Sequence, residues 1–193
     1  MALKGKKPQP KDRRLKLFMY GEAGVGKTTA ACQLPKPYII DTERGTDNYA
    51  DLIDGVGGSV FQSIDSDEII DEVRSLRSEK HDFRTLVLDS LTPFYFDLLE
   101  KSEAKVGSEY GRHYGEANKV MRRLVNLIME LDMNVVITAH SKPVYGDDMK
   151  VLSVTFDGWK KLDYIFDLVL ELRRGSPTQR YARIVKTRIE PFP

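Results

Sequence analysis

The sequence predicts an α/β domain in which a mostly parallel central sheet is flanked by helices and extended by antiparallel strands near its C-terminal end. Three observations support this fold class. Segments of strand and helix character alternate along the chain, and the strand segments are nearly continuous apolar runs, as in parallel strands buried on both faces. A glycine-rich loop also stands between an apolar stretch and a helical segment. The 193 residues suffice for one such domain with a sizeable core.

Regular structure is expected to start at residue 15. Lys, Pro, Gln and Arg dominate residues 1–14, so we expect a flexible basic arm there and a single domain over residues 15–193. The expected strands cover residues 15–20, 38–41, 59–62, 85–89, 135–139, 150–155, 165–172 and 181–187. The expected helices cover residues 27–33, 46–53, 65–78, 93–106 and 117–131, with loops at 107–115 and 141–150.

Two of these helices carry specific signals. Asp65 and Glu68 have the spacing of a capping box, and the helix that they open has one apolar face, formed by Ile69, Ile70, Val73 and Leu76. The helix at 117–131 has apolar residues at helical spacing, namely Val120, Met121, Leu124, Leu127, Ile128 and Leu131. Two large aromatic residues later in the chain, Phe156 and Trp159, are expected to pack in the core.

The glycine-rich segment fits the phosphate-binding pattern G-x-x-x-x-G-K-[ST] in full, with Gly21, Glu22, Ala23, Gly24, Val25, Gly26, Lys27 and Thr28. Glycines allow backbone N–H groups to converge on phosphate oxygens, Lys27 supplies a cation for the β- and γ-phosphates, and the Thr28 hydroxyl can bind Mg²⁺. The next residue, Thr29, belongs to the same candidate site. The segment therefore predicts a nucleoside triphosphate with Mg²⁺, against the alternative of a glycine-rich turn with a chance Lys-Thr pair.

Two carboxylates follow predicted strands. Asp89 ends the apolar segment 85–89, where a fixed negative charge can hold Mg²⁺ against the phosphates; a helix-capping role is the alternative. Glu43 comes just after the strand at 38–41, at the edge where open α/β sheets bind ligands. A general base must lie close to the water that it activates, and this edge offers such a place. The alternative for Glu43 is a solvated loop acid.

The strand 38–41 with the Asp41-Thr42-Glu43 sequence resembles the RecA-like recombinase ATPases, whose corresponding glutamate activates the attacking water. Further segments occur in the order of the RecA core, so the resemblance covers roughly residues 15–192: they are 63–65, 88–93, 121–124 and 184–192. The resemblance implies a RecA-like P-loop NTPase fold and ATP as the nucleotide. The Ala139-His140-Ser141-Lys142 run is most similar to the compact phage ATPases of single-strand annealing type, whereas bacterial RecA has Gln at the position of His140.

The resemblance also implies roles for individual residues. His140 would sense the γ-phosphate, and Lys186 and Arg188 would extend across a subunit interface to a neighbour's ATP. Tyr49 would stack on adenine. The alternatives are a strand-end histidine hydrogen-bonded within a loop for His140, and a solvated strand face for the basic pair.

Two loops match the positions of the DNA loops of the RecA core. They carry aromatic and basic residues that suit single-stranded DNA, of which we single out Arg112, His113, Tyr114, Lys142 and Tyr145. The second loop also contains Asp147 and Asp148, which weakens its electrostatic attraction for DNA. Ordinary surface connections are the alternative for both loops.

Composition excludes several classes of protein. The formal net charge is only +1, but residues 1–16 carry seven Lys/Arg and one acid, which suits a polyanion or an acidic neighbouring subunit, or only a soluble tail. A single cysteine, Cys32, excludes an internal disulfide and a cysteine-based zinc site. No run approaches 18 apolar residues and no apolar signal core begins the chain, so we expect a cytoplasmic protein, in the bacterial host if a phage encodes it.

The sequence therefore favours a DNA-dependent ATPase that binds Mg²⁺, ATP and single-stranded DNA, assembles with itself into a filament or ring, and promotes annealing or strand exchange in phage recombination or repair. A single-strand binding protein is a further candidate partner. Two other classes stay open: a nucleotide-switched recombination mediator or packaging accessory without significant hydrolysis, and a small-molecule P-loop kinase.

Overall fold

The computed structural model describes residue 5 and residues 14–190. Most of the predicted basic arm at 1–14 therefore lies outside the described residues, as do the last three positions of the predicted domain. The structure has a sheet in the order β3-β2-β4-β5-β1-β7-β8, with β6 paired to β5. The strands are β1 Lys16–Gly21, β2 Pro37–Asp41, β3 Ser59–Gln62, β4 Thr85–Asp89, β5 Asn134–Tyr145, β6 Val151–Asp157, β7 Leu168–Arg174 and β8 Arg180–Thr187.

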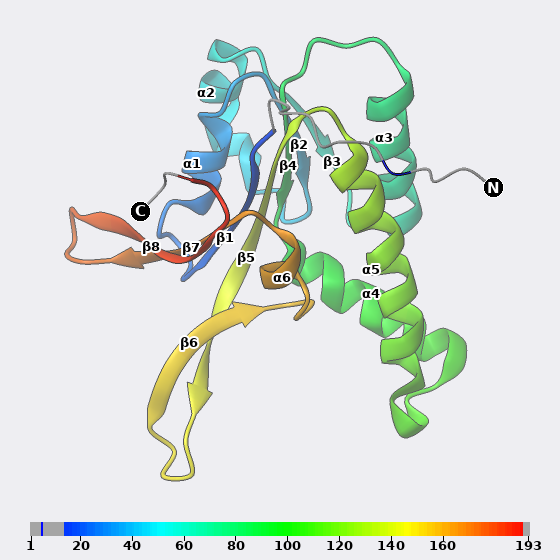
Figure 1. The fold of residues 1–193 in the computed structure, drawn as a ribbon, viewed down its shortest axis with the longest axis vertical. Coiled ribbons are helices and arrows are strands. Elements are labelled where there is room, and N and C mark those ends of the chain that lie inside the picture. Colours follow the sequence, from blue (N-terminus) through cyan, green and yellow to red (C-terminus); the bar gives the residue numbers. More distant parts are fainter. Residues whose placement is uncertain (1–4, 6–13, 191–193) are drawn as a thin grey trace.

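Helices cover both faces of the sheet, as Figure 1 shows. The α-helices are α1 Lys27–Cys32, α2 Ala50–Gly55, α3 Ser66–Ser78, α4 Leu91–Val106, α5 Arg112–Glu130 and α6 Leu162–Ile165, and two 3-10 turns are η1 Thr46–Tyr49 and η2 Glu109–Gly111. Strands β1 to β5 pair in parallel, whereas β6 and β8 pair antiparallel with β5 and β7. The predicted fold class, a mostly parallel sheet with antiparallel C-terminal strands, is confirmed.

Strand β1 shows why the apolar runs are continuous. Its Phe18 and Tyr20 belong to the larger core cluster, which includes side chains of α3, α4 and α5, whereas Leu17 and Met19 belong to the cluster on the side of α1 and α2. Successive side chains of a strand point to opposite faces, so a strand covered on both faces needs apolar residues at every position.

The N-terminus of α3 follows the predicted cap only in part. The Asp65 carboxylate accepts hydrogen bonds from the backbone N–H groups of Asp67 and Glu68, as an N-cap does. The Glu68 side chain does not return to the Asp65 backbone, because its carboxylate accepts a hydrogen bond from Ser63 Oγ at 2.6 Å and Asp65 N donates to the same hydroxyl. The predicted apolar face of α3 is buried, and so are Phe156 and Trp159.

Helix α5 begins earlier than its apolar periodicity indicates. Residues 112–114 were expected in a loop, but they form the first turn of α5, after Gly111 with φ 72°. A glycine adopts this left-handed conformation at little cost and lets the chain turn directly into the helix. The predicted start at 117 was wrong because the exposed first turn carries no apolar repeat.

The predicted loop at 141–150 is a β-hairpin. Strand β5 continues past the expected end at 139 to Tyr145, and β6 pairs back along it from His140 opposite Asp157 to Tyr145 opposite Val151. The hairpin projects away from the helical layers (Figure 1), so its strands lack the apolar pattern of buried strands.

A further correction concerns residues 165–172, where β7 begins only at Leu168 because α6 occupies Leu162–Ile165. Among the described residues, no helix combines the length and apolarity needed to cross a membrane.

The cap of α3 generates a stability prediction. Asp65→Ala removes the acceptor of two backbone N–H groups and should lower the free energy of unfolding by about 1 kcal/mol. Asp65→Asn retains an oxygen acceptor but lacks the charge that pairs with Lys101, so it is the matched control and should cost roughly 0.5 kcal/mol or less. Urea unfolding measures both; equal losses in the two variants would assign the effect to the ion pair instead of the cap.

Candidate functional site

The carboxyl ends of four parallel strands meet at one edge of the sheet. Strand β5 lies between β1 and β4, and β2 lies on the far side of β4. The register places Gly21 opposite His140 and Asp41 opposite Asp89. Because ligands bind at the carboxyl ends of strands in open α/β sheets, this edge is the candidate site, and it collects the predicted phosphate loop, Glu43, Asp89 and His140.

The phosphate loop adopts a conformation that depends on its glycines. Gly24 and Gly26 have φ values of 69° and 100°, in the left-handed region that side chains other than glycine rarely adopt. A Cβ at Gly21 would lie 2.5 Å from the Leu172 carbonyl oxygen, so the close passage of β7 also requires glycine there. Val25 is buried and anchors the loop, while Arg174 at the end of β7 donates to the Gly24 carbonyl at 3.3 Å.

Lys27 lies folded against its own loop. Its Nζ donates to the carbonyl oxygens of Gly21 at 2.8 Å and Glu22 at 2.9 Å, and the side chain is buried. Burial lowers the pKa of the Lys27 ammonium, and the carboxylates of Asp89 and Glu43 oppose this shift. The cation is thus held at the loop by two carbonyl dipoles, which phosphate oxygens can replace at low cost because both are oxygen acceptors.

Thr28 and Asp89 form the candidate metal centre. Thr28 Oγ1 donates to Asp89 Oδ2 at 2.6 Å, and Thr138 Oγ1 of β5 donates to Asp89 Oδ1. Burial raises the pKa of the Asp89 carboxyl above its usual value, and the hydrogen bonds from Thr138 and Thr28 offset only part of this shift. A hydroxyl and a carboxylate are the hard oxygen ligands that Mg²⁺ prefers, so these residues fit the ion. Sequence reasoning missed Thr138, which lies within an apolar strand with no motif of its own.

Glu43 and His140 are brought together from 97 positions apart. His140 Nε2 lies 2.7 Å from Glu43 Oε1, and Ser90 Oγ donates to the same carboxylate oxygen. The Glu43 and His140 side chains are 39% and 44% exposed, so water has access to them. A carboxylate held by two partners beside the phosphate loop can orient a water molecule. Ser90 was not predicted, although its place directly after Asp89 puts it at the same sheet edge.

Asp41 shapes the loop that carries Glu43. Its buried carboxylate accepts from the backbone N–H groups of Glu43, Gly45 and Thr46 and from Thr46 Oγ1 at 2.6 Å. Burial raises the pKa of Asp41, but the hydrogen bonds, led by those from Thr46, outweigh it and hold the pKa below its usual value. An ionised acid therefore fixes the backbone at Glu43 and in the residues that follow it, a role that the sequence pattern alone did not reveal.

Tyr49 lies beside α1. Its hydroxyl accepts a hydrogen bond from Thr29 Oγ1 at 3.3 Å, and its ring packs partly buried against the core cluster on that face of the sheet. Thr29 and Tyr49, which were both predicted to belong to the nucleotide site, are therefore neighbours in the structure.

Lys186 and Arg188 do not join the site within one chain. Lys186 pairs with Val169 near the start of β7, whereas the phosphate loop faces the other end of that strand. Lys186 Nζ donates to the carbonyl oxygens of Phe166 at 2.8 Å and of Asp163, and Arg188 Nη2 donates to Tyr164 O at 2.7 Å. The two cations therefore lie around α6, and Arg188 follows the end of β8 instead of lying within it.

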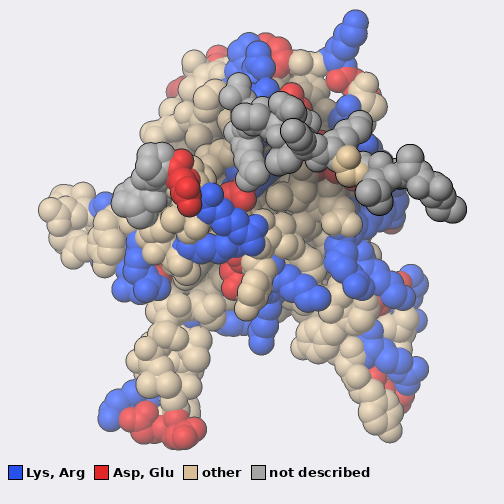
Figure 2. All heavy atoms as spheres, in the orientation of Figure 1, with Lys and Arg blue, Asp and Glu red and all other residues tan. Residues whose placement is uncertain are grey.

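The residues predicted to contact DNA fall into two groups. Tyr114 and Lys142 line a common pocket between α4, α5 and the segment after β6. The others are Arg112, which pairs with Glu109; His113, whose ring centroid is 4.1 Å from that of Tyr114; and Tyr145, which is exposed on the hairpin. Figure 2 shows both signs of charge at the tip of the hairpin, where Lys150 pairs with Asp148.

Comparisons with known proteins agree with this fold. A family model described as "AAA domain" matches residues 13–191. Among solved structures, the chain is similar to "Crystal structure of the RadB recombinase", with a TM-score of 0.59, 20% sequence identity, and coverage of 91% of this chain and 83% of that chain. This similarity shows a shared RecA-like fold. No curated protein matches the chain.

The buried Asp89 generates a prediction on stability. Asp89→Asn keeps an oxygen that can accept a hydrogen bond from one threonine, and it removes the buried charge. The free energy of unfolding of the variant should therefore be about 0.5–2 kcal/mol higher than that of the unmodified protein at neutral pH. Because burial raises the folded pKa, the ionised carboxylate lowers stability above that pKa, and the difference should vanish as the pH falls below the unfolded pKa. Thermal unfolding between pH 3 and 8 measures this, with the exposed Asp51→Asn as the control; a less stable Asn variant at neutral pH would contradict it.

Proposed function

The chain belongs to the AAA domain family, and from this membership and the RecA-like fold we propose that it binds Mg²⁺ and ATP, hydrolyses ATP, and acts on single-stranded DNA. The observation that carries the proposal is the convergence of Lys27, the Thr28–Asp89 pair and the Glu43–His140 pair on one sheet edge. Phosphate binding, metal binding and water activation are the three tasks of a hydrolysing P-loop site, and each has a residue of suitable chemistry here.

The hydrolytic step needs a water positioned in line with the γ-phosphate. Glu43 would orient that water, with its carboxylate held by Ser90 and His140 and its backbone held by Asp41. Bound Mg²⁺ would neutralise charge on the phosphates. Lys27 would leave the carbonyl oxygens of its loop and donate to phosphate oxygens.

His140 is suited to report the state of the nucleotide. Its side chain contacts Glu43, and it lies where the sheet part of β5 continues into the projecting hairpin. A γ-phosphate oxygen that accepts a hydrogen bond from His140 would alter this contact, and the pairing of the hairpin begins at His140 itself. We expect this connection to make ATP hydrolysis respond to DNA.

Self-assembly would complete the site. Lys186 and Arg188 are far from the phosphate loop of their own chain, so a catalytic role requires them to act on a neighbouring subunit's nucleotide in a filament or ring. Annealing or strand exchange in phage recombination is the process that we propose for such an assembly. The printed name of the similar structure, a recombinase, supports this assignment by analogy of fold.

The role of Glu43 is tested by Glu43→Gln. Loss of the general base should lower the single-turnover rate of ATP hydrolysis by about 10²–10⁴-fold, while the affinity for ATP changes little. Radiolabelled ATP gives the rate and a fluorescent ATP analogue gives the affinity. Glu100→Gln, an exposed acid on α4, is the matched control and should hydrolyse ATP as the unmodified protein does. If the unmodified protein hydrolyses no ATP with or without single-stranded DNA, the nucleotide acts only as a switch.

The composite site is tested by mixing two inactive variants. Lys27→Ala disables a subunit's own phosphate loop, and Arg188→Ala disables the contribution to a neighbour, so each alone should have little activity. An equal mixture should recover roughly a quarter of the wild-type ATPase rate, because random assembly places a Lys27→Ala subunit next to half of the intact loops. A mixture no more active than the separate variants would contradict action in trans.

A further inference from the structure

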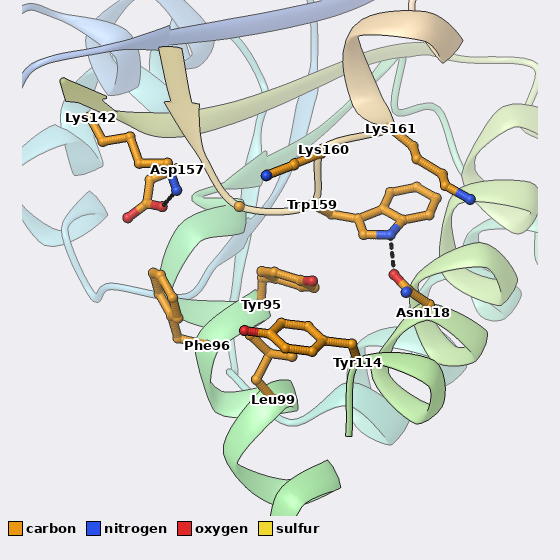
Figure 3. A pocket seen from close by; sticks show the side chains of 11 residues that line it. Tyr95, Phe96, Leu99, Tyr114, Asn118, Lys142, Asp157, Trp159, Lys160 and Lys161 are labelled. Carbon is orange, nitrogen blue, oxygen red and sulfur yellow. Dashed lines mark hydrogen bonds and ion pairs between the residues drawn. The ribbon is translucent and has the colours of Figure 1, made fainter. Parts of the chain in front are cut away.

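A pocket opens on the side of α4 and α5 that faces the β6–α6 connection (Figure 3). It has a volume of about 530 Å³, within the range of small-molecule and cofactor sites. Tyr95, Phe96 and Leu99 come from α4, and Tyr114 comes from the first turn of α5. Trp159 lies across from Tyr95 and Tyr114, on the chain segment between β6 and α6.

Two of the aromatic residues that line the pocket are exposed. Phe96 is 43% exposed and Tyr114 is 51% exposed, although each borders a deeply buried core. Exposed aromatic faces at the mouth of a pocket are the groups on which unpaired bases stack, since every base has a π-face. By contrast, Tyr95 and Trp159 are 9% and 3% exposed and form the inner wall.

Polar groups accompany the aromatic rings. Lys142, Lys160 and Lys161 line the pocket, and the last two are exposed, so they can attract the phosphates on either side of a bound base. Lys142 Nζ pairs with Asp157 Oδ1 at 2.6 Å. Trp159 Nε1 donates to Asn118 Oδ1 at 2.6 Å, and this bond orients the Asn118 amide so that its NH₂ group can serve as a donor to a base edge.

We propose that this pocket captures one unpaired base of single-stranded DNA, stacked on Phe96 and Tyr114, with the flanking phosphates on Lys160 and Lys161. The proposal rests on the proposed function, because it assigns to the DNA a specific binding site. Such a pocket differs from a positively charged surface that binds only the phosphate backbone, because the base itself also contributes to the affinity for DNA.

The pocket is joined to the nucleotide site by hydrogen bonds. Thr92 Oγ1 accepts from the backbone N–H of His140 at 2.9 Å and donates to the backbone carbonyl of Asp157 at 2.7 Å. His140 contacts Glu43, and Asp157 pairs with Lys142 at the pocket. A base that displaces Lys142 or the segment after β6 therefore acts on a residue that is two hydrogen bonds from His140, so occupancy of the pocket can influence Glu43.

Trp159 makes the proposal directly measurable, because it is the single tryptophan of the chain. We would titrate the full-length protein with an oligo(dT) strand and with an abasic strand of the same length, which retains the phosphates but has no bases. Fluorescence anisotropy of the labelled strands gives total binding, and Trp159 emission reports the pocket. Phe96→Ala and Tyr114→Ala remove the exposed rings, and Tyr164→Ala, an exposed ring outside the pocket, is the matched control.

The expected result has three parts. First, oligo(dT) changes Trp159 emission and the abasic strand does not. Second, Phe96→Ala and Tyr114→Ala each weaken oligo(dT) binding about tenfold, whereas Tyr164→Ala does not. Third, neither pocket variant weakens binding of the abasic strand. Phe96→Leu and Tyr114→Leu preserve apolar volume and give the same comparison where an alanine variant unfolds.

Two other results are distinguishable. If oligo(dT) and the abasic strand bind equally well and the pocket variants match Tyr164→Ala, the base pocket is overturned while DNA binding by other residues stands. If the unmodified protein binds neither strand in low salt, the proposed action on single-stranded DNA fails, and the pocket assignment fails with it.

Discussion

The buried carboxylate of Asp89 is the contact around which the rest of the site is arranged. It ends β4, receives hydrogen bonds from Thr28 at the start of α1 and from Thr138 of β5, and so ties the phosphate loop to the two strands beside it. Strand β5 lies between β1 and β4, so Asp89 contacts Thr138 on the adjacent strand and also Thr28 on the helix that follows β1. Burying a charged group is unfavourable unless hydrogen bonds compensate, and here the two hydroxyls offset part of that cost and hold the carboxylate where we propose that it binds a metal ion.

A second buried acid, Asp41, performs the corresponding task for the side of the site where we propose that Glu43 activates water. Its hydrogen bonds to the backbone on both sides of Arg44 define the loop, and Glu43 then lies close enough to His140 and Ser90 for direct contact. The two buried acids, Asp89 and Asp41, hold the strands and loops of the site in place. The half-exposed Glu43 is left accessible for the water activation that we propose. The Glu43–His140 contact joins β2 to β5, the strand that leaves the sheet as the hairpin.

The proposed base pocket depends on features outside the central sheet. The first turn of α5 supplies Tyr114, the hairpin supplies Lys142, and the segment between β6 and α6 supplies Trp159 and Lys160. Thr92 at the start of α4 then bonds both to the strand that carries His140 and to the end of β6. Nucleotide chemistry on one side and DNA on the other would therefore act on a common pair of segments, which gives a physical basis for an ATPase that responds to DNA.

The sequence by itself determined the fold class and most strands, and it predicted the residues that the structure brings together at the candidate site, because these depend on local signals: continuous apolar runs, the glycine pattern before Lys27, and acids placed directly after strands. It did not determine the partners Thr138 and Ser90, the start of α5 at Arg112, or the hairpin at 141–150. Thr138 and Ser90 gain their roles only when parallel pairing brings separate strands into register, and an exposed helix turn or hairpin has no core to impose an apolar period. Tertiary structure alone decided these features because each depends on contacts between segments far apart in the chain.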